Sequence, residues 1–136
     1  MAIDYGDSRT GLAVSDLSAT LAGEAWVLYE KNIKAAAEII AEAAVTREVG
    51  SIVIGYPKNM DGSVGHRAEK SELLGRLVSE HCDIEVVLWD ERLTTMRANR
   101  ILSDTGSRGK KRKNTIDAVA ASLILESYLD YKSGRG

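Results

Sequence analysis

Acidic residues stand at three separated places in the sequence where they could act together. Asp4 follows a short apolar stretch, Asp90 and Glu91 follow a longer one, and Asp117 stands at the start of the last apolar pattern. Carboxylates that converge in a fold repel one another unless a divalent cation neutralises them. Oxygen-only ligands select a hard ion such as Mg²⁺ or Mn²⁺, and such ions serve phosphoryl transfer. If these segments meet, the acids predict metal-dependent hydrolysis of phosphate esters.

Each acid also has a local explanation. Asp117 stands three residues after Asn114, which is the spacing of a capping box, and a carboxylate there would favour the helix dipole. Asp4 could order the turn that follows it, and Asp90 and Glu91 could pair with nearby arginines at the surface. The combination of acids, rather than any one of them, favours a site.

Basic residues gather between the acidic pair and Asp117. In a chain of net charge −2, such a cluster of lysines and arginines is typical of a phosphate-binding surface. The alternative is a solvated loop, which most runs of charged residues form. We expect a glycine-containing loop that leads to Asp117 in the first turn of the last helix, and we favour nucleic acid because this loop adjoins the predicted metal site. No aromatic pair offers a base-stacking platform, so recognition of backbone and shape is expected, on a structured nucleic acid. The predicted contacts are Arg92, Arg97, Arg100, Arg108, Lys110, Lys111, Arg112, Lys113 and Lys58.

The composition fits one globular domain, residues 1–136, with an aliphatic core because phenylalanine is absent. No apolar run is long enough to span a bilayer, so we expect a cytoplasmic protein with no membrane partner. Cys82 is the only cysteine, which excludes an internal disulfide and favours a core position. His66 and His81 lack the acidic partners that suggest zinc, and we expect surface or capping roles for them.

Hydrophobic patterning predicts the elements that position these groups. Three strands form a meander, and two later strands each follow a helix, which implies parallel pairing through right-handed crossovers. The expected strands are Ala2 to Asp4, Thr10 to Val14, Ala25 to Tyr29, Ser51 to Gly55 and Ile84 to Trp89. The expected helices are Asn32 to Val49, His66 to Cys82, Thr94 or Thr95 to Gly106, and a last helix over 116–131 capped by Asn114 or Thr115. The chain is therefore predicted to be α/β, with a mixed five-stranded sheet, three antiparallel strands and then two parallel ones, flanked by helices.

The segment "GYPKNMDGS", residues 55–63, allows two interpretations. Its small residues and Asn59 could present backbone N–H groups to a phosphate, but Pro57 and the pair Asp61 and Gly62 are also what a tight turn requires. Lys58 is a further candidate contact in either case.

Four blocks of the sequence resemble one known family. They are "IDYGDSRTGLAVSD", "IVIGYPKNMDGS", "DERLTT" and "KRKNTIDAVAASLILESYL", in this order and over most of the chain. They are similar to the YqgF/RuvX family of RNase H-like nucleases. The resemblance implies an RNase H-like fold and a bacterial cytoplasmic nuclease that processes the 5′ end of pre-16S rRNA.

The resemblance also implies roles for individual residues. Asp4, Glu91 and Asp117 match the acids of the first, third and fourth blocks, and they would coordinate Mg²⁺ or Mn²⁺, with water as the nucleophile. Asp90 is a candidate for supporting these ligands. Members of the family carry a few more residues before the first acid, so the three residues before Asp4 in this chain would shorten a central strand of the sheet.

Three other functions follow from the same features. Resolution of Holliday junctions would use the same chemistry on branched DNA and would need a dimer, whereas the rRNA nuclease could be a monomer or a dimer. A nucleic-acid-binding factor without catalysis would use the basic run and keep the acids as structural residues. The block "DYGDSRTGLAV" is also similar to the first phosphate loop of actin-like ATPases, but that architecture needs a second related domain, for which this chain is too short.

Overall fold

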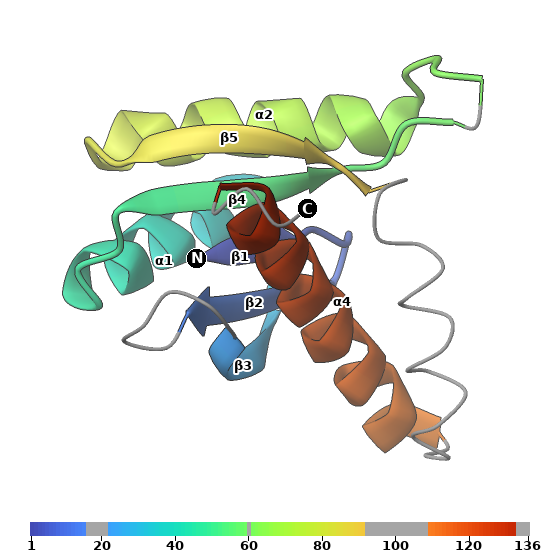
Figure 1. The fold of residues 1–136 in the computed structure, drawn as a ribbon, viewed down its shortest axis with the longest axis horizontal. Coiled ribbons are helices and arrows are strands. Elements are labelled where there is room, and N and C mark those ends of the chain that lie inside the picture. The colour runs from blue at the N-terminus through green and yellow to red at the C-terminus, as the bar shows by residue number, and fades with distance from the viewer. Residues whose placement is uncertain (16–21, 60, 92–108, 133–136) are drawn as a thin grey trace.

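The computed structural model describes residues 1–15, 22–59, 61–91 and 109–132, with side chains described in these ranges except at residues 22 and 109–117. Figure 1 shows the helices and strands, coloured from blue to red in chain order. They are β1 (Ala2–Asp4), β2 (Arg9–Ser15), β3 (Ala22–Tyr29), α1 (Ile33–Thr46), β4 (Ser51–Tyr56), α2 (His66–His81), β5 (Glu85–Asp90) and α4 (Gly109–Lys132).

The strands form one five-stranded sheet in the order β3-β2-β1-β4-β5. β2 is antiparallel to both β1 and β3, while β4 is parallel to β1 and to β5. The predicted mixed sheet is therefore confirmed. β1 is the central strand, and its carboxyl end lies at the same edge of the sheet as the carboxyl ends of β4 and β5, because the three strands are parallel.

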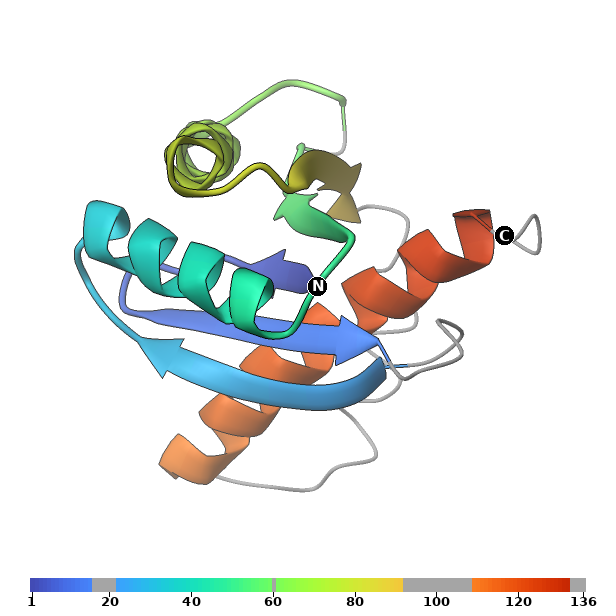
Figure 2. The same cartoon turned by 90° about the vertical axis from the view of Figure 1, so that its left-hand side faces the viewer.

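Helices cover both faces of the sheet, with α1 and α2 on one face and α4 on the other (Figure 2). Ile3 and Tyr5 pack in the cluster with α1 and α2, whereas Ala2 packs with α4. Side chains alternate between the two faces of a strand, so Asp4 shares the α4 face with Ala2. The alternation along β1 therefore decides on which side of the sheet a site at Asp4 must lie.

The start of α1 agrees with its predicted cap. The Asn32 side chain accepts hydrogen bonds from the backbone N–H groups of Lys34 at 2.9 Å and Ala35 at 3.1 Å. These bonds satisfy two of the N–H groups that the first helical turn leaves without a partner.

The last helix differs from its prediction, because it begins at Gly109 rather than near Asn114 or Thr115. The expectation of a basic loop over 109–113 was therefore wrong, and that segment forms the first turns of α4, as lysine and arginine are good helix formers. Asp117 is the ninth residue of α4, beyond its first turn, so the capping-box explanation for this acid does not hold. The helix expected from Thr94 or Thr95 to Gly106 lies outside the described residues. Within the described ranges, no helix is both long and apolar enough to cross a membrane.

Candidate active site

Two of the predicted acids, Asp4 and Glu91, lie at the carboxyl ends of the strands on either side of β4. Asp4 ends β1, and Glu91 directly follows β5. β1 pairs with β4 through Ile3 and Ile54, so the next position along this register sets Asp4 beside Gly55. Gly55 in turn pairs with Trp89 of β5. The register therefore sets Asp4, Gly55 and Trp89 side by side across three parallel strands, with Glu91 two residues after Trp89.

The Glu91 side chain reaches over β4 at Gly55. A Cβ built on Gly55 would lie 2.5 Å from Glu91 Oε1 and 2.9 Å from Glu91 Cδ. Neighbouring strands lie about 4.8 Å apart, so the Gly55 backbone that the Glu91 carboxylate covers lies about one strand spacing from the Asp4 backbone. The same hypothetical Cβ would lie 2.8 Å from Ile124 Cδ1 of α4, which shows that this carboxylate is on the α4 face, as Asp4 is.

The third acid, Asp117, is described only by its backbone. It lies in α4 one turn before Ala121, a fully buried residue that packs in the same cluster as Ala2 of β1. Its side chain lies outside the description, so its participation stays a prediction. Among the described side chains, no group of three acidic, histidine or cysteine residues is arranged to hold a metal ion.

Asp90, predicted to support the metal ligands, and the predicted nucleic-acid contacts lie at several places in the fold. Asp90 pairs in register with Tyr56, and strand alternation sets it on the α2 face with Val86, opposite Glu91. Lys58 follows β4, and its Nζ lies 5.7 Å from the ring centroid of Tyr56. Four of the predicted contacts lie outside the described residues, namely Arg92, Arg97, Arg100 and Arg108. Four others have only their backbone described, in the first turns of α4, namely Lys110, Lys111, Arg112 and Lys113.

The loop that follows Asp4 lies against the start of α2. Tyr5, Gly6 and Asp7 line a cavity of about 30 Å³ together with residues of the first helical turns. Lys70 Nζ lies 3.5 Å from an Asp7 carboxylate oxygen. Burial raises the pKa of the Tyr5 hydroxyl, the positive charge of Lys70 lowers it, and the negative charge of Asp7 raises it. These contacts connect the loop to the start of α2, at the edge of the sheet where β1 ends with Asp4.

The segment 55–63 is held together by its own hydrogen bonds. Asn59 N–H donates to the Ser63 carbonyl at 3.0 Å, and Gly62 N–H donates to the Asn59 carbonyl at 2.8 Å. Ser63 N–H donates to an Asp61 carboxylate oxygen at 2.9 Å, and Gly62 has φ of 87°. These features are those of a tight turn, and they occupy backbone N–H groups that the phosphate-binding interpretation would need free.

Tyr56 anchors the end of β4 to α2. Its hydroxyl donates a hydrogen bond to the Glu72 carboxylate. This bond is the main cause that raises the pKa of the Tyr56 hydroxyl, with smaller effects from burial and from the negative charges of Glu72 and Glu69. The hydrogen bond therefore fixes this end of β4 to α2, on the face of the sheet opposite α4.

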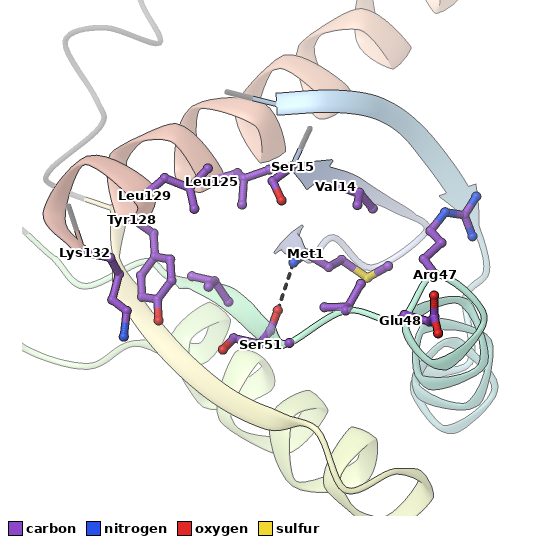
Figure 3. Close-up of a pocket in the computed structure, with 13 residues that line it drawn as sticks. Met1, Val14, Ser15, Arg47, Glu48, Ser51, Leu125, Tyr128, Leu129 and Lys132 are labelled. Carbon is purple, nitrogen blue, oxygen red and sulfur yellow. Dashed lines mark hydrogen bonds between the residues drawn. The ribbon is translucent and has the colours of Figure 1, made fainter. Parts of the chain in front are cut away.

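Two large cavities among the described residues lie away from Asp4 and Glu91. One, of about 610 Å³, lies beside Met1 at the opposite end of β1 from Asp4 (Figure 3). The other, of about 660 Å³, lies between α2 and β5 and is lined by Gly75, Val86 and Leu88 among others.

The residues at Gly55 suit a hard divalent cation. Carboxylate oxygens are the donors that Mg²⁺ and Mn²⁺ prefer. The absence of a Cβ at Gly55 leaves the space that the Glu91 carboxylate occupies, on the same face of the sheet as Asp4. The chemistry of the donors and the shape of this space therefore fit the predicted ion.

Gly55 is the residue that the sequence interpretation missed as part of the site. A glycine inside the apolar strand "SIVIGY" was a usable signal, because a strand glycine marks a place where another group approaches the backbone closely.

This sheet order, with helices on both faces, is that of the RNase H-like fold. The fold is shared with solved structures of RuvC. One is entitled "T. thermophilus RuvC in complex with Holliday junction substrate", with a TM-score of 0.63, 12% identity, and coverage of 97% of this chain and 93% of that one. Another, "Thermus thermophilus RuvC structure", has a TM-score of 0.56 at 12% identity and covers 98% of this chain and 95% of that one.

The particular family follows from sequence comparison. The profile of the family described as "RuvX: Holliday junction resolvase" matches residues 1–131. A protein of Halothermothrix orenii is 43% identical over 98% of this chain and 95% of its own length, and one of Halalkalibacterium halodurans is 45% identical over 96% and 94%. Both carry the name "Putative pre-16S rRNA nuclease". The chain belongs to the RuvX family, as the four sequence blocks predicted.

Proposed function

We propose that residues 1–136 act as a single nuclease domain that hydrolyses phosphodiester bonds in structured RNA in the cytoplasm, at the 5′ end of pre-16S rRNA. The observation that carries the proposal is the placement of Asp4 and Glu91 on one face of the sheet, across the gap that Gly55 leaves. The names of the relatives from Halothermothrix orenii and Halalkalibacterium halodurans support the choice of substrate.

Three acids would form the reactive centre. Asp4 and Glu91, with Asp117 from α4, would hold Mg²⁺ or Mn²⁺, which when bound supplies positive charge that activates water and stabilises the departing oxygen. The chain would hold these carboxylate oxygens in place, because the acids lie in or directly after strands of the sheet and in α4. Asp4 lies in the central strand, and the Glu91 carboxylate lies over β4. No covalent bond between enzyme and substrate is required.

The predicted basic contacts would hold the RNA by its phosphates. Lys58 lies two residues after the end of β4, and residues 110–113 lie in the same helix as Asp117. Contacts of this kind position the backbone without reading bases, so binding should weaken as salt rises. Each lysine that contacts a phosphate should lower the slope of log affinity against log salt by about 1 when it is replaced by alanine.

Removal of single carboxylates tests the proposal. The change Asp4→Asn, Glu91→Gln or Asp117→Asn should lower Mg²⁺-dependent cleavage of a precursor rRNA at least about 100-fold, with the fold and much of the RNA affinity retained. Glu42→Gln is the matched control, because Glu42 is exposed on α1, across the sheet from α4. If all three variants cleave as the unmodified chain does, the assignment of the acids is wrong.

Cleavage of Holliday junctions is a second candidate, favoured by the description of the matching family. It needs two coordinated cuts and therefore a dimer that presents two sites to one junction. A panel of precursor rRNA, single strands and four-way junctions separates the two substrates, and sedimentation measures the oligomeric state. Calorimetric titration with Mn²⁺ tests the remaining alternative, since a chain that binds no cation even with RNA present would be a binding factor without catalysis.

A further inference from the structure

Gly55 lies at the point where β4 passes beneath the Glu91 carboxylate. Its neighbours across the sheet are Trp89 on one side and, one step along the register, Asp4 on the other. The remaining residues of β4 all carry side chains, and four of the six, Ile52 to Ile54 and Tyr56, are large and buried. Glycine weakens the interior of a strand, so its presence here needs a local reason.

The local reason is a shortage of space above the backbone. A Cβ on Gly55 would lie 2.5 Å from Glu91 Oε1, 2.9 Å from Glu91 Cδ and 2.8 Å from Ile124 Cδ1. Real Cβ atoms essentially never lie closer than 3.0 Å to such neighbours, so both side chains would have to move. Ile124 is 1% exposed in the core, so the carboxylate at the end of β5 has the greater freedom to shift.

We infer that Gly55 is a positioning residue, which sets the Glu91 carboxylate beside Asp4 by leaving the space that a side chain would fill. The inference rests on the proposed function, in that Glu91 serves as an acid of the reactive centre. The inference assigns a role in the site to a residue that has no side chain. An alanine at this position would push the Glu91 oxygens away from β4, and a displacement of about 1 Å in a reacting geometry can lower the rate about 100-fold.

The first test replaces Gly55 with alanine. Gly55→Ala should lower kcat for Mg²⁺-dependent RNA cleavage about 100-fold and leave KM within about threefold, because the phosphate contacts are elsewhere. Gly50→Ala is the matched control, since a Cβ at Gly50 in the turn before β4 meets nothing within 4 Å. A Gly55→Ala chain that is folded and cleaves as fast as the Gly50→Ala chain would overturn the inference.

A second variant separates the two contacts. Ile124→Val removes the Cδ1 atom that would lie 2.8 Å from the new Cβ and leaves the Glu91 contact in place. Gly55→Ala/Ile124→Val should therefore recover stability lost by Gly55→Ala while kcat stays low. This double variant also serves as the folded form if Gly55→Ala alone does not fold. If the double variant recovers full kcat, packing against Ile124 is the reason for the glycine, and the positioning role is refuted.

Calorimetric titration with Mn²⁺ gives a readout that does not depend on cleavage. Gly55→Ala should weaken Mn²⁺ binding about 10- to 100-fold, as changes beside metal ligands do. In a chain that already carries Glu91→Gln, adding Gly55→Ala should weaken Mn²⁺ binding no further. The reason is that Gly55→Ala acts by displacing the Glu91 carboxylate, which Glu91→Gln has already removed. An equal loss in both backgrounds would overturn the inference. If Glu91→Gln itself leaves cleavage unchanged, Glu91 is not an acid of the reactive centre, and that part of the proposed function fails instead.

Discussion

The amino group of Met1 gives a prediction whose size follows from the structure. Met1 is 5% exposed, and its ammonium group donates a hydrogen bond to the Ser51 carbonyl at 2.9 Å, at the edge of the cavity between β2 and β4 (Figure 3). Burial lowers the pKa of this group from 8.0 to about 6. The folded chain therefore disfavours the charged amine, whereas the unfolded chain does not.

The sign of the pH dependence follows from proton binding. Between pH 6 and pH 8 the unfolded chain holds more protons at this group than the folded chain, so the free energy of unfolding rises with pH in that window. Burial of the charged Met1 amine destabilises the folded chain fully below pH 6, and this destabilisation is absent above pH 8. At about 1.4 kcal/mol for each pKa unit, the total change is about 3 kcal/mol.

Urea unfolding followed by far-UV circular dichroism between pH 5 and pH 9 measures this change. The comparison is with the same chain acetylated at Met1, whose retention is checked by mass spectrometry, because acetylation removes the charge. Arg47, Glu48 and Lys132 also line the cavity, and the difference between the two chains cancels their own titration and that of every other group. The reasoning is refuted if the two chains show the same dependence on pH.

Two further changes test the turns and caps that support the sheet. Gly6→Ala should lower the free energy of unfolding by about 1–3 kcal/mol, because a Cβ there would overlap the Arg9 carbonyl oxygen in the turn after β1. Thermal unfolding checks it, and an unchanged midpoint would contradict the steric argument. Asn32→Ala should cost about 1 kcal/mol in urea unfolding, since the N–H groups of Lys34 and Ala35 lose their acceptor. A loss well below 0.5 kcal/mol would mean that water replaces the cap.

Much of the fold could be predicted because its strands and helices carry strong local patterns. The run at Ser51–Tyr56 is apolar on both faces of a buried strand, and the alanine-rich segment after Asn32 has helical spacing and a cap. The start of α4 could not be predicted in the same way. Its first turns carry polar and basic residues with no apolar periodicity, so the only boundary signals were Asn114 and Thr115, which the longer helix includes.

The candidate acids could be predicted for a related reason. Asp4 and Glu91 each end or follow an apolar strand, and parallel strands place their carboxyl ends at one edge. Their chemistry is also a property of residue type, since carboxylate oxygens suit a hard cation wherever they converge. What the strand pattern does not contain is the distance across the sheet from one side chain to another.

By itself, the order of apolar and polar residues determined the sheet and its mixed pairing, and the resemblance of four sequence blocks indicated the family. The sequence also pointed to Asp4 at the end of one strand and Glu91 just after another. Only the tertiary structure decided that Gly55 lies beneath the Glu91 carboxylate, that Ile124 closes over the same point, and that the Met1 amine is buried beside Ser51. The physical reason is that local patterns report which face a residue occupies. Steric exclusion and desolvation instead depend on groups that are far apart in the chain and meet only after packing.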